Sequence, residues 1–120
     1  MKVIHLAGAE TYEPEPDWKR ASLCDQPQVS LEYFVKPPHH ASPLHEHPQE
    51  QVTIVVKGKM RAVSGDGTEA ILDECDAAYF AGGEPHQIIN MLDEKSVGVD
   101  IFTPRRSFDF WLKRKKERED

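Results

Sequence analysis

The sequence has few cysteines and no long apolar run, and each absence excludes a class of protein. Cys24 and Cys75 are the only cysteines and do not form a CxxC pair. We therefore expect two reduced, buried thiols rather than a disulfide or a cysteine-ligated metal. No apolar stretch approaches the ~20 residues of a transmembrane helix, and the N-terminal one turns acidic too soon for a signal peptide. These features predict a cytoplasmic protein without a membrane partner.

Positive charge is also scarce. The formal net charge is −6 at pH 7, which argues against a general nucleic-acid binder. The tail "KRKKERED" is locally basic, but acidic residues interrupt it, so we interpret it as a solvated helix end.

Short β-forming segments fill most of the chain, while helical periodicity is rare. Residues 1–28 are expected to be irregular or edge-like, because two prolines in "YEPEPDW" exclude an inner strand. Strands are predicted from alternation, β-branched residues and turn signals in the runs 29–35, 51–58, 59–65, 70–74, 77–83, 86–92 and 96–104. This pattern predicts an all-β sandwich, barrel or jelly roll. We expect one domain over residues 1–120, with a barrel core at about 28–104.

The segment after Pro104 has a different pattern. Phe108, Trp111 and Leu112 recur at helical spacing, so a short C-terminal helix is predicted over about 105–118, covering part of the β core.

Two histidines, His45 and His47, are separated by one residue and followed by the β-forming run. In a regular strand both would lie on one face, with Gln51 on that face and Glu50 turned outward. A bulge near Pro48 would reverse this order. An HxH pair is often only a surface pair, so the pair alone does not establish a metal site.

A third histidine makes a metal site the favoured interpretation. His86 begins a predicted strand after a Gly-Gly-x-Pro turn, and three imidazoles plus one oxygen suit Zn, Fe, Mn, Ni or Cu. His5, His39 and His40 lack this arrangement, and we expect the last two to be exposed or at a pocket rim.

The first motif resembles that of the cupin superfamily. The family pattern has HxH, three or four residues, an acid or glutamine, six residues and a glycine. Here His45, His47, Gln51 and Gly58 fit this spacing, while Glu50 lies one residue too far from the glycine.

The second cupin motif follows downstream. Gly83, His86 and Asn90 fit it, while Ala81 replaces its proline; in the first motif, His39 replaces the leading glycine. The resemblance implies a double-stranded β-helix, a jelly-roll barrel with one divalent transition metal at its mouth. The implied ligands are His45, His47, Gln51 and His86. Small cupins are usually homodimers, which implies a homodimer here.

The run "DIFTPRRSFDF" is similar to one in small cupins of the KdgF pectin-degradation type, which ketonise 4,5-unsaturated uronates. Their functional positions fall on Asp100, Phe102 and Arg106. Arg105 replaces a proline of that run, and Phe108 is an insertion. The resemblance implies a sugar acid as substrate, with Asp100 moving a proton and Arg106 binding a carboxylate.

Each of these three residues also has a plain structural interpretation. Asp100 could pair with a nearby arginine, Phe102 could be core, and Arg106 could form a surface salt bridge. Arg20 and Arg61 are weaker candidates for binding the carboxylate.

Two other functions remain open from the sequence. A non-haem metal dioxygenase could use the same ligands, and some cupins bind sugars or other small ligands without turning them over. Oxygen uptake, or tight binding without turnover, would identify these alternatives.

Overall fold

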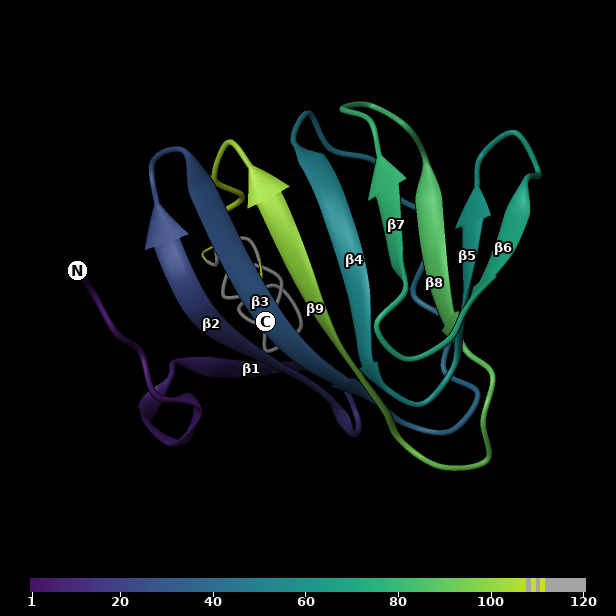
Figure 1. Ribbon diagram of the computed structural model, residues 1–120, viewed down its shortest axis with the longest axis horizontal. Helices are drawn as coiled ribbons and strands as arrows, with labels where there is room; N and C mark the ends of the chain where they lie inside the picture. The colour runs from purple at the N-terminus through teal and green to yellow at the C-terminus, as the bar shows by residue number, and fades with distance from the viewer. Residues whose placement is uncertain (108, 110, 112–120) are drawn as a thin grey trace, which may run out of the picture.

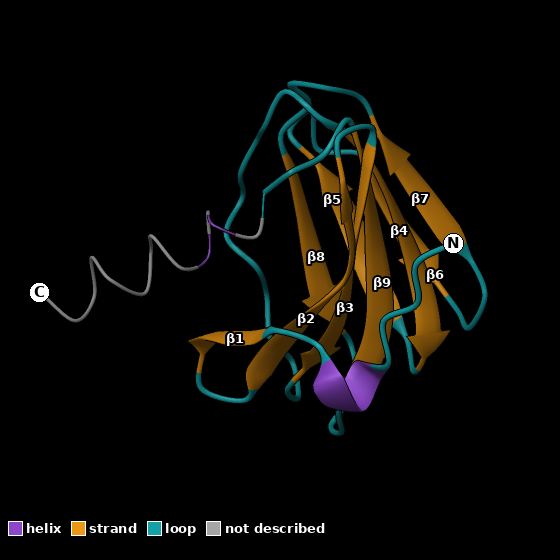
Figure 2. Cartoon of the chain, turned by 90° about the vertical axis from the view of Figure 1, so that its left-hand side faces the viewer, coloured by secondary structure: helices purple, strands orange, loops and turns teal. Residues whose placement is uncertain are grey.

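The computed structural model describes residues 1–107, 109 and 111. Within this part of the chain nine strands form two antiparallel sheets (Figure 1). The six-stranded sheet has the order β1 (Thr11–Glu15), β2 (Trp18–Gln26), β3 (Val29–Lys36), β9 (Ser96–Thr103), β4 (Glu50–Lys57), β7 (Ala77–Phe80). The three-stranded sheet has the order β6 (Glu69–Leu72), β5 (Met60–Ser64), β8 (His86–Asn90). Figure 2 shows β1 projecting from the lower end, beside the short 3-10 helix Leu6–Gly8.

The interior is lined by alternate residues of each strand, as expected where one sheet face is buried. One apolar cluster packs between the sheets: Phe34, Val55, Met60, Ala62, Leu72, Phe80 and Ile88. A second cluster holds Tyr12, Trp18 and Trp111. Burial of each large side chain stabilises the fold by about 1.5–3 kcal/mol.

β3 and β9 bury charged residues where alternation would favour apolar ones. β3 buries Glu32 and Lys36 on the face that also holds Phe34, and β9 buries Asp100 on the face that also holds Phe102. Because charged residues are almost never fully buried without a partner, their position marks a polar region inside the fold.

Tight turns set the strand registers. Gly58 joins β4 to β5 with φ of 100°, a conformation that favours glycine, and an added Cβ would collide with Ser96. Gly67 has φ of 89° between β5 and β6. Both turns lie between consecutive predicted strands.

The all-β prediction is confirmed, but two details of it were wrong. β2 is a nine-residue inner strand within the part expected to be irregular or edge-like, so the sheet core begins well before residue 28. Its pairing with β3 shifts register between Ser22 and Cys24, and this irregularity breaks the alternation that would have revealed a strand. Both cysteines are free as expected, but neither is buried: Cys24 is half-buried, and Cys75 is exposed because it lies in the turn before β7.

The predicted helix at about 105–118 lies largely outside the described residues, including Phe108 and Leu112. Trp111 is described, and it packs on Tyr12 and Trp18. No helix among the described residues has the length and apolarity to cross a membrane.

Candidate metal centre and cavity

Three histidines converge where the chain segment after β3 meets the start of β8. His45 forms an isolated antiparallel bridge with His86, and His47 follows two residues later. One ring nitrogen from each of His45, His47 and His86 lies within 4.8 Å of the other two. The three imidazoles can therefore contact a single ion.

Backbone carbonyls determine which nitrogen faces the centre. Each Nδ1 lies near a carbonyl oxygen: Pro43 for His45 (2.8 Å), Gln49 for His47 (3.1 Å) and Glu84 for His86 (2.8 Å). A carbonyl only accepts hydrogen bonds, so Nδ1 carries the proton in each ring. Each neutral ring then presents the Nε2 lone pair, held in the orientation that metal-binding histidines need.

Gln51 completes the group, and Glu50 does not. Oε1 of Gln51 lies 3.0 Å from Nε2 of His47 and 3.0 Å from Nε2 of His86. Glu50 is exposed and accepts a hydrogen bond from Tyr79 on the outer face. Gln51 therefore faces the histidines and Glu50 faces outward, as predicted from the sequence.

Strand alternation explains only part of this arrangement. Residues 46–49 are not in a strand, and β4 begins at Glu50, so the alternation does not extend back to the histidines. Gln51 faces inward because β4 itself alternates, with Gln51, Thr53 and Val55 buried. The six-residue gap between Gln51 and Gly58 identifies Gln51 without requiring residues 46–49 to be in a strand.

The hydrogen-bonding pattern fits a cation. Nε2 of His47, Nε2 of His86 and Oε1 of Gln51 are all acceptors, so no proton lies between them to stabilise their short contacts. A cation among these atoms would turn repulsion into attraction. Three imidazoles with one oxygen suit a divalent transition metal.

Burial keeps two of these rings neutral. The pKa of His45 is lowered to about 4 and the pKa of His47 is also lowered, in both cases mainly by desolvation. The charge of Arg106 contributes to both shifts, so this guanidinium acts electrostatically on the centre.

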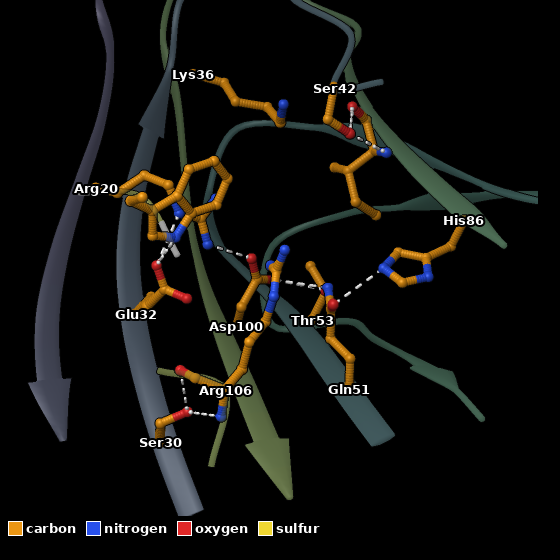
Figure 3. A network of polar contacts seen from close by, with 12 residues as sticks. Arg20, Ser30, Glu32, Lys36, Ser42, Gln51, Thr53, His86, Asp100 and Arg106 are labelled. Atoms are coloured by element: carbon orange, nitrogen blue, oxygen red, sulfur yellow. Dashed lines mark hydrogen bonds and ion pairs between the residues drawn. The ribbon is translucent and has the colours of Figure 1, made fainter. Parts of the chain in front are cut away.

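Asp100 fixes the orientation of Gln51 from the interior side (Figure 3). Nε2 of Gln51 donates to Thr53 Oγ1 (2.9 Å) and to Asp100 Oδ1 (3.2 Å), and Thr53 donates to the same oxygen (2.6 Å). The other oxygen of Asp100 accepts from Arg20 at 2.7 Å. Since the amide nitrogen is held toward Asp100, the amide oxygen must face the histidines.

Arg20 is a buried ion-pair partner rather than a free anion-binding group. It contacts both Asp100 and Glu32, and its side chain is 4% exposed. The structural interpretation of Asp100, a pair with an arginine, therefore holds, although Arg20 lies 80 positions away in sequence. Arg61 lies on the smaller sheet near Glu69, away from the centre.

Arg106 and Phe102 lie beside the histidines. Phe102 is fully buried and its ring meets that of His47 edge to face at 5.5 Å. The Arg106 guanidinium lies 5.4 Å from the ring centroids of Phe102 and Trp111. Ser30 holds the Arg106 backbone by accepting from its N–H (3.0 Å) and donating to its carbonyl (3.2 Å).

An open cavity of about 360 Å³ adjoins the centre. Its walls come from the histidine segment, from the residues after β9 and from two tryptophans: Trp18, Pro43, His45, Glu46, His47, Pro48, Gln49, Arg106, Ser107 and Trp111. A smaller cavity of about 20 Å³ lies deeper and is shared by His45, Gln51, Asp100, Arg106 and Lys36, among others. The larger cavity admits a small organic molecule, and the smaller one admits about one water or oxygen atom.

The structure thus brings together all seven predicted site residues. Sequence reasoning missed Thr53, Ser30, Glu32 and Lys36. A polar residue at an inward position of a strand was the available signal for each of them.

The sequence match spans the strands that carry the centre. Residues 32–102, from β3 to β9, match the family model described as "Cupin domain". The chain belongs to the cupin family. The resemblance seen in the two motifs is therefore confirmed.

Similar proteins include a protein named an isomerase and solved structures with the same fold. A Bacillus subtilis protein named H2HPP isomerase is 30% identical over 101 residues, covering 77% of this cupin and 42% of that protein, so the chain spans less than half of that relative. The structure of KdgF from Halomonas sp. has a TM-score of 0.82 and 20% identity, covering 92% of this cupin and 98% of that chain. The structure of an RmlC-like cupin from Shewanella frigidimarina has a TM-score of 0.80 and 20% identity. The match covers 92% of this cupin and 96% of that chain. At these identities the two structures show a shared fold.

Proposed function

We propose that this cupin is a metal-dependent isomerase that ketonises a small anionic enol, with 4,5-unsaturated uronates as the first substrate class to test. The observation that carries the proposal is the arrangement around Gln51. Its oxygen joins three imidazoles, its nitrogen contacts a buried carboxylate, and Arg106 lines the adjoining cavity.

The ligand set is neutral in its protein groups. His45, His47, His86 and Gln51 leave a divalent ion (Zn, Ni, Fe, Mn or Cu) with its full charge. Such an ion would supply a Lewis acid that polarises a hydroxyl or carbonyl oxygen.

The chain's own residues would hold the substrate and move the proton. Arg106 would bind the carboxylate bidentately, as guanidinium groups do. Asp100 would accept the enol hydroxyl proton, because its carboxylate lines the deeper cavity beside Gln51. Phe102 would exclude water from this wall. The isomerase name of the Bacillus subtilis relative and the fold shared with KdgF support this choice of chemistry.

The test uses purified protein loaded separately with each candidate metal. Loss of the absorbance of a 4,5-unsaturated uronate should be faster with metal-loaded protein than with chelated protein. Arg106→Lys should raise KM at least tenfold, because lysine cannot bind a carboxylate bidentately. Arg105→Lys is the matched control, since Arg105 pairs with Asp25 at the surface.

Two outcomes would contradict the proposal. Unchanged absorbance with every metal would exclude uronate ketonisation, and tight uronate binding without turnover would identify a binding protein. An unaltered rate in Asp100→Asn would remove the proposed role of Asp100.

We also propose a homodimer, which sedimentation of the purified protein would test.

A further inference from the structure

Lys36 is a buried charged residue that the proposed reaction does not use. It ends β3 on the inward face, its relative exposure is 1%, and it lines the deeper cavity. In Figure 3, Lys36 and Arg106 reach the polar network from opposite sides. A lysine in this position is costly to bury, so a functional role deserves a test.

A histidine links Lys36 to the surface. Nζ of Lys36 lies 2.9 Å from Nδ1 of His40, and Nε2 of His40 contacts Oε2 of Glu15. Side-chain exposure rises along this path, from the buried Lys36 to 12% for His40 and 49% for Glu15. The Trp18 ring covers both inner groups, with its centroid 4.5 Å from Nζ and 4.7 Å from the imidazole centroid.

The hydrogen-bond roles suit proton transfer. An ammonium on Lys36 donates to Nδ1 of His40, and the N–H at Nε2 of His40 then donates to the Glu15 carboxylate. An imidazole in this position can accept a proton at one nitrogen while it releases one from the other.

The charges around Lys36 make its protonation reversible near neutral pH. Its pKa is lowered to about 7, mainly by desolvation and also by the charge of Arg20, while Asp100 and Glu15 act in the opposite direction. The imidazole of His40 contacts Nζ directly. His45 and Arg106 also line the deeper cavity with Lys36.

We propose that Lys36 is a second proton-transfer residue of this cavity, and that His40 and Glu15 exchange its protons with solvent. The reaction step of this proposal rests on the proposed function, whereas the proton path does not depend on it. Through a water in the deeper cavity, the Lys36 ammonium would deliver a proton to the substrate carbon as the C–H bond forms and the O–H bond breaks. Asp100 would take the hydroxyl proton and later release it to solvent, and Lys36 would be reprotonated through His40.

The path can be tested without turnover. In zinc-loaded, ¹⁵N-labelled protein, NMR would measure how fast the Lys36 Nζ protons exchange with water. His40→Asn retains a polar group near Nδ1 but cannot reach Glu15, and we expect at least tenfold slower exchange. His39→Asn is the matched control, because His39 also pairs with a surface acid, Asp93, and should leave the exchange rate unchanged. Equal rates in wild type and His40→Asn would overturn the proton path.

Turnover provides the second measurement. His40→Asn should lower kcat at least tenfold with little change in KM, and small imidazole buffers should restore the rate. A structural defect would not be rescued by buffer, so unrescued loss contradicts the proposal. If exchange slows as expected but no uronate reacts, the proton path stands and the proposed reaction fails.

Discussion

Gln51 donates a hydrogen bond to Asp100 across 3.2 Å, and this contact determines which end of its amide faces the histidines. The candidate metal centre is therefore oriented from the interior side by a buried carboxylate that is itself held by Arg20. Four groups from β2, β4 and β9 share this arrangement, so changes within it affect both metal binding and stability.

Gln51→Glu should destabilise the metal-free protein. The substitution replaces an amide donor with a carboxylate oxygen next to Asp100 and Thr53, and we expect a loss of about 1–3 kcal/mol in the free energy of unfolding at pH 7.5. Bound zinc should restore more stability than in the wild type, because the new charge attracts the ion. Urea unfolding with and without zinc measures both effects. Gln26→Glu is a control at a site where Lys2 is the neighbour; a metal-free Gln51→Glu protein as stable as the wild type would contradict the amide orientation.

Metal addition should raise the melting temperature of chelated protein. Binding stabilises only the folded state, by about 2.7 kcal/mol when free metal is 100 times its Kd. His86→Gln should remove most of this rise, whereas His5→Gln, at an exposed histidine, should retain it. Thermal unfolding with Zn, Ni, Mn, Fe and Cu would also rank the metals. An equal rise in His86→Gln would place the bound metal elsewhere.

Gly82 should be intolerant of a larger residue. An added Cβ would collide with the carbonyl oxygen of Pro48, which follows His47, and the neighbouring Gly83 donates a hydrogen bond to the His47 carbonyl. Gly82→Ala should therefore push the segment of Gly82 away from the segment of His47. We expect zinc binding to weaken about tenfold, because losing contacts that orient metal ligands typically costs this much affinity. Gly8→Ala is the control, since nothing lies within 4 Å of its added Cβ. Competition with a zinc chelator measures the affinity, and equal affinity in both variants would contradict this prediction.

Metal-free protein should lose stability on acidification through His45. Its folded pKa of about 4 is below the ordinary value of 6.5, so the unfolded chain binds a proton first. The stability from this group is full above pH 6.5, falls between about 6.5 and 4, and changes little below that. The loss is at most about 3 kcal/mol. His45→Asn should unfold with a flatter dependence over this range in urea titrations, and an identical slope would show that His45 does not contribute.

Lys36→Met should stabilise the protein near neutral pH. The folded pKa of about 7 is below the ordinary 10.5, so burial of Lys36 costs up to about 4 kcal/mol at pH 7. The wild type recovers this stability as the pH rises toward 10.5, where the unfolded chain also loses its proton. We expect a net gain of about 1–3 kcal/mol at pH 7 that shrinks at higher pH, measured by urea unfolding. A destabilised Lys36→Met protein would indicate a structural role for this lysine.

Local pattern was sufficient to predict the strands from β3 onward and the histidines of this cupin. β4, β5, β8 and β9 have clean alternation bounded by turn residues, and the spacing of His45, His47 and His86 around them is short-range information. β2 was missed because Arg20 is a buried charge and a register shift interrupts its alternation. The buried charge is explained only when β3 and β9 supply Glu32 and Asp100 as partners.

The same limit applies to the site. The family resemblance assigned Asp100 to the site, but its contact with Arg20 spans 80 positions. The path from Lys36 to Glu15 joins the end of β3 to β1, which pair only through β2. Such relationships depend on sheet order, which alternation and turn residues do not specify.

The chain has two tryptophans, Trp18 and Trp111, and both line the larger cavity. Their rings meet edge to face at 5.6 Å, and the Trp111 Nε1 donates to Glu32 at 2.6 Å. All tryptophan fluorescence of the native protein therefore originates beside the candidate site. Ligand screening can use this emission directly, without a dye or an introduced label, and Tyr12 beside Trp111 provides a nearby energy donor.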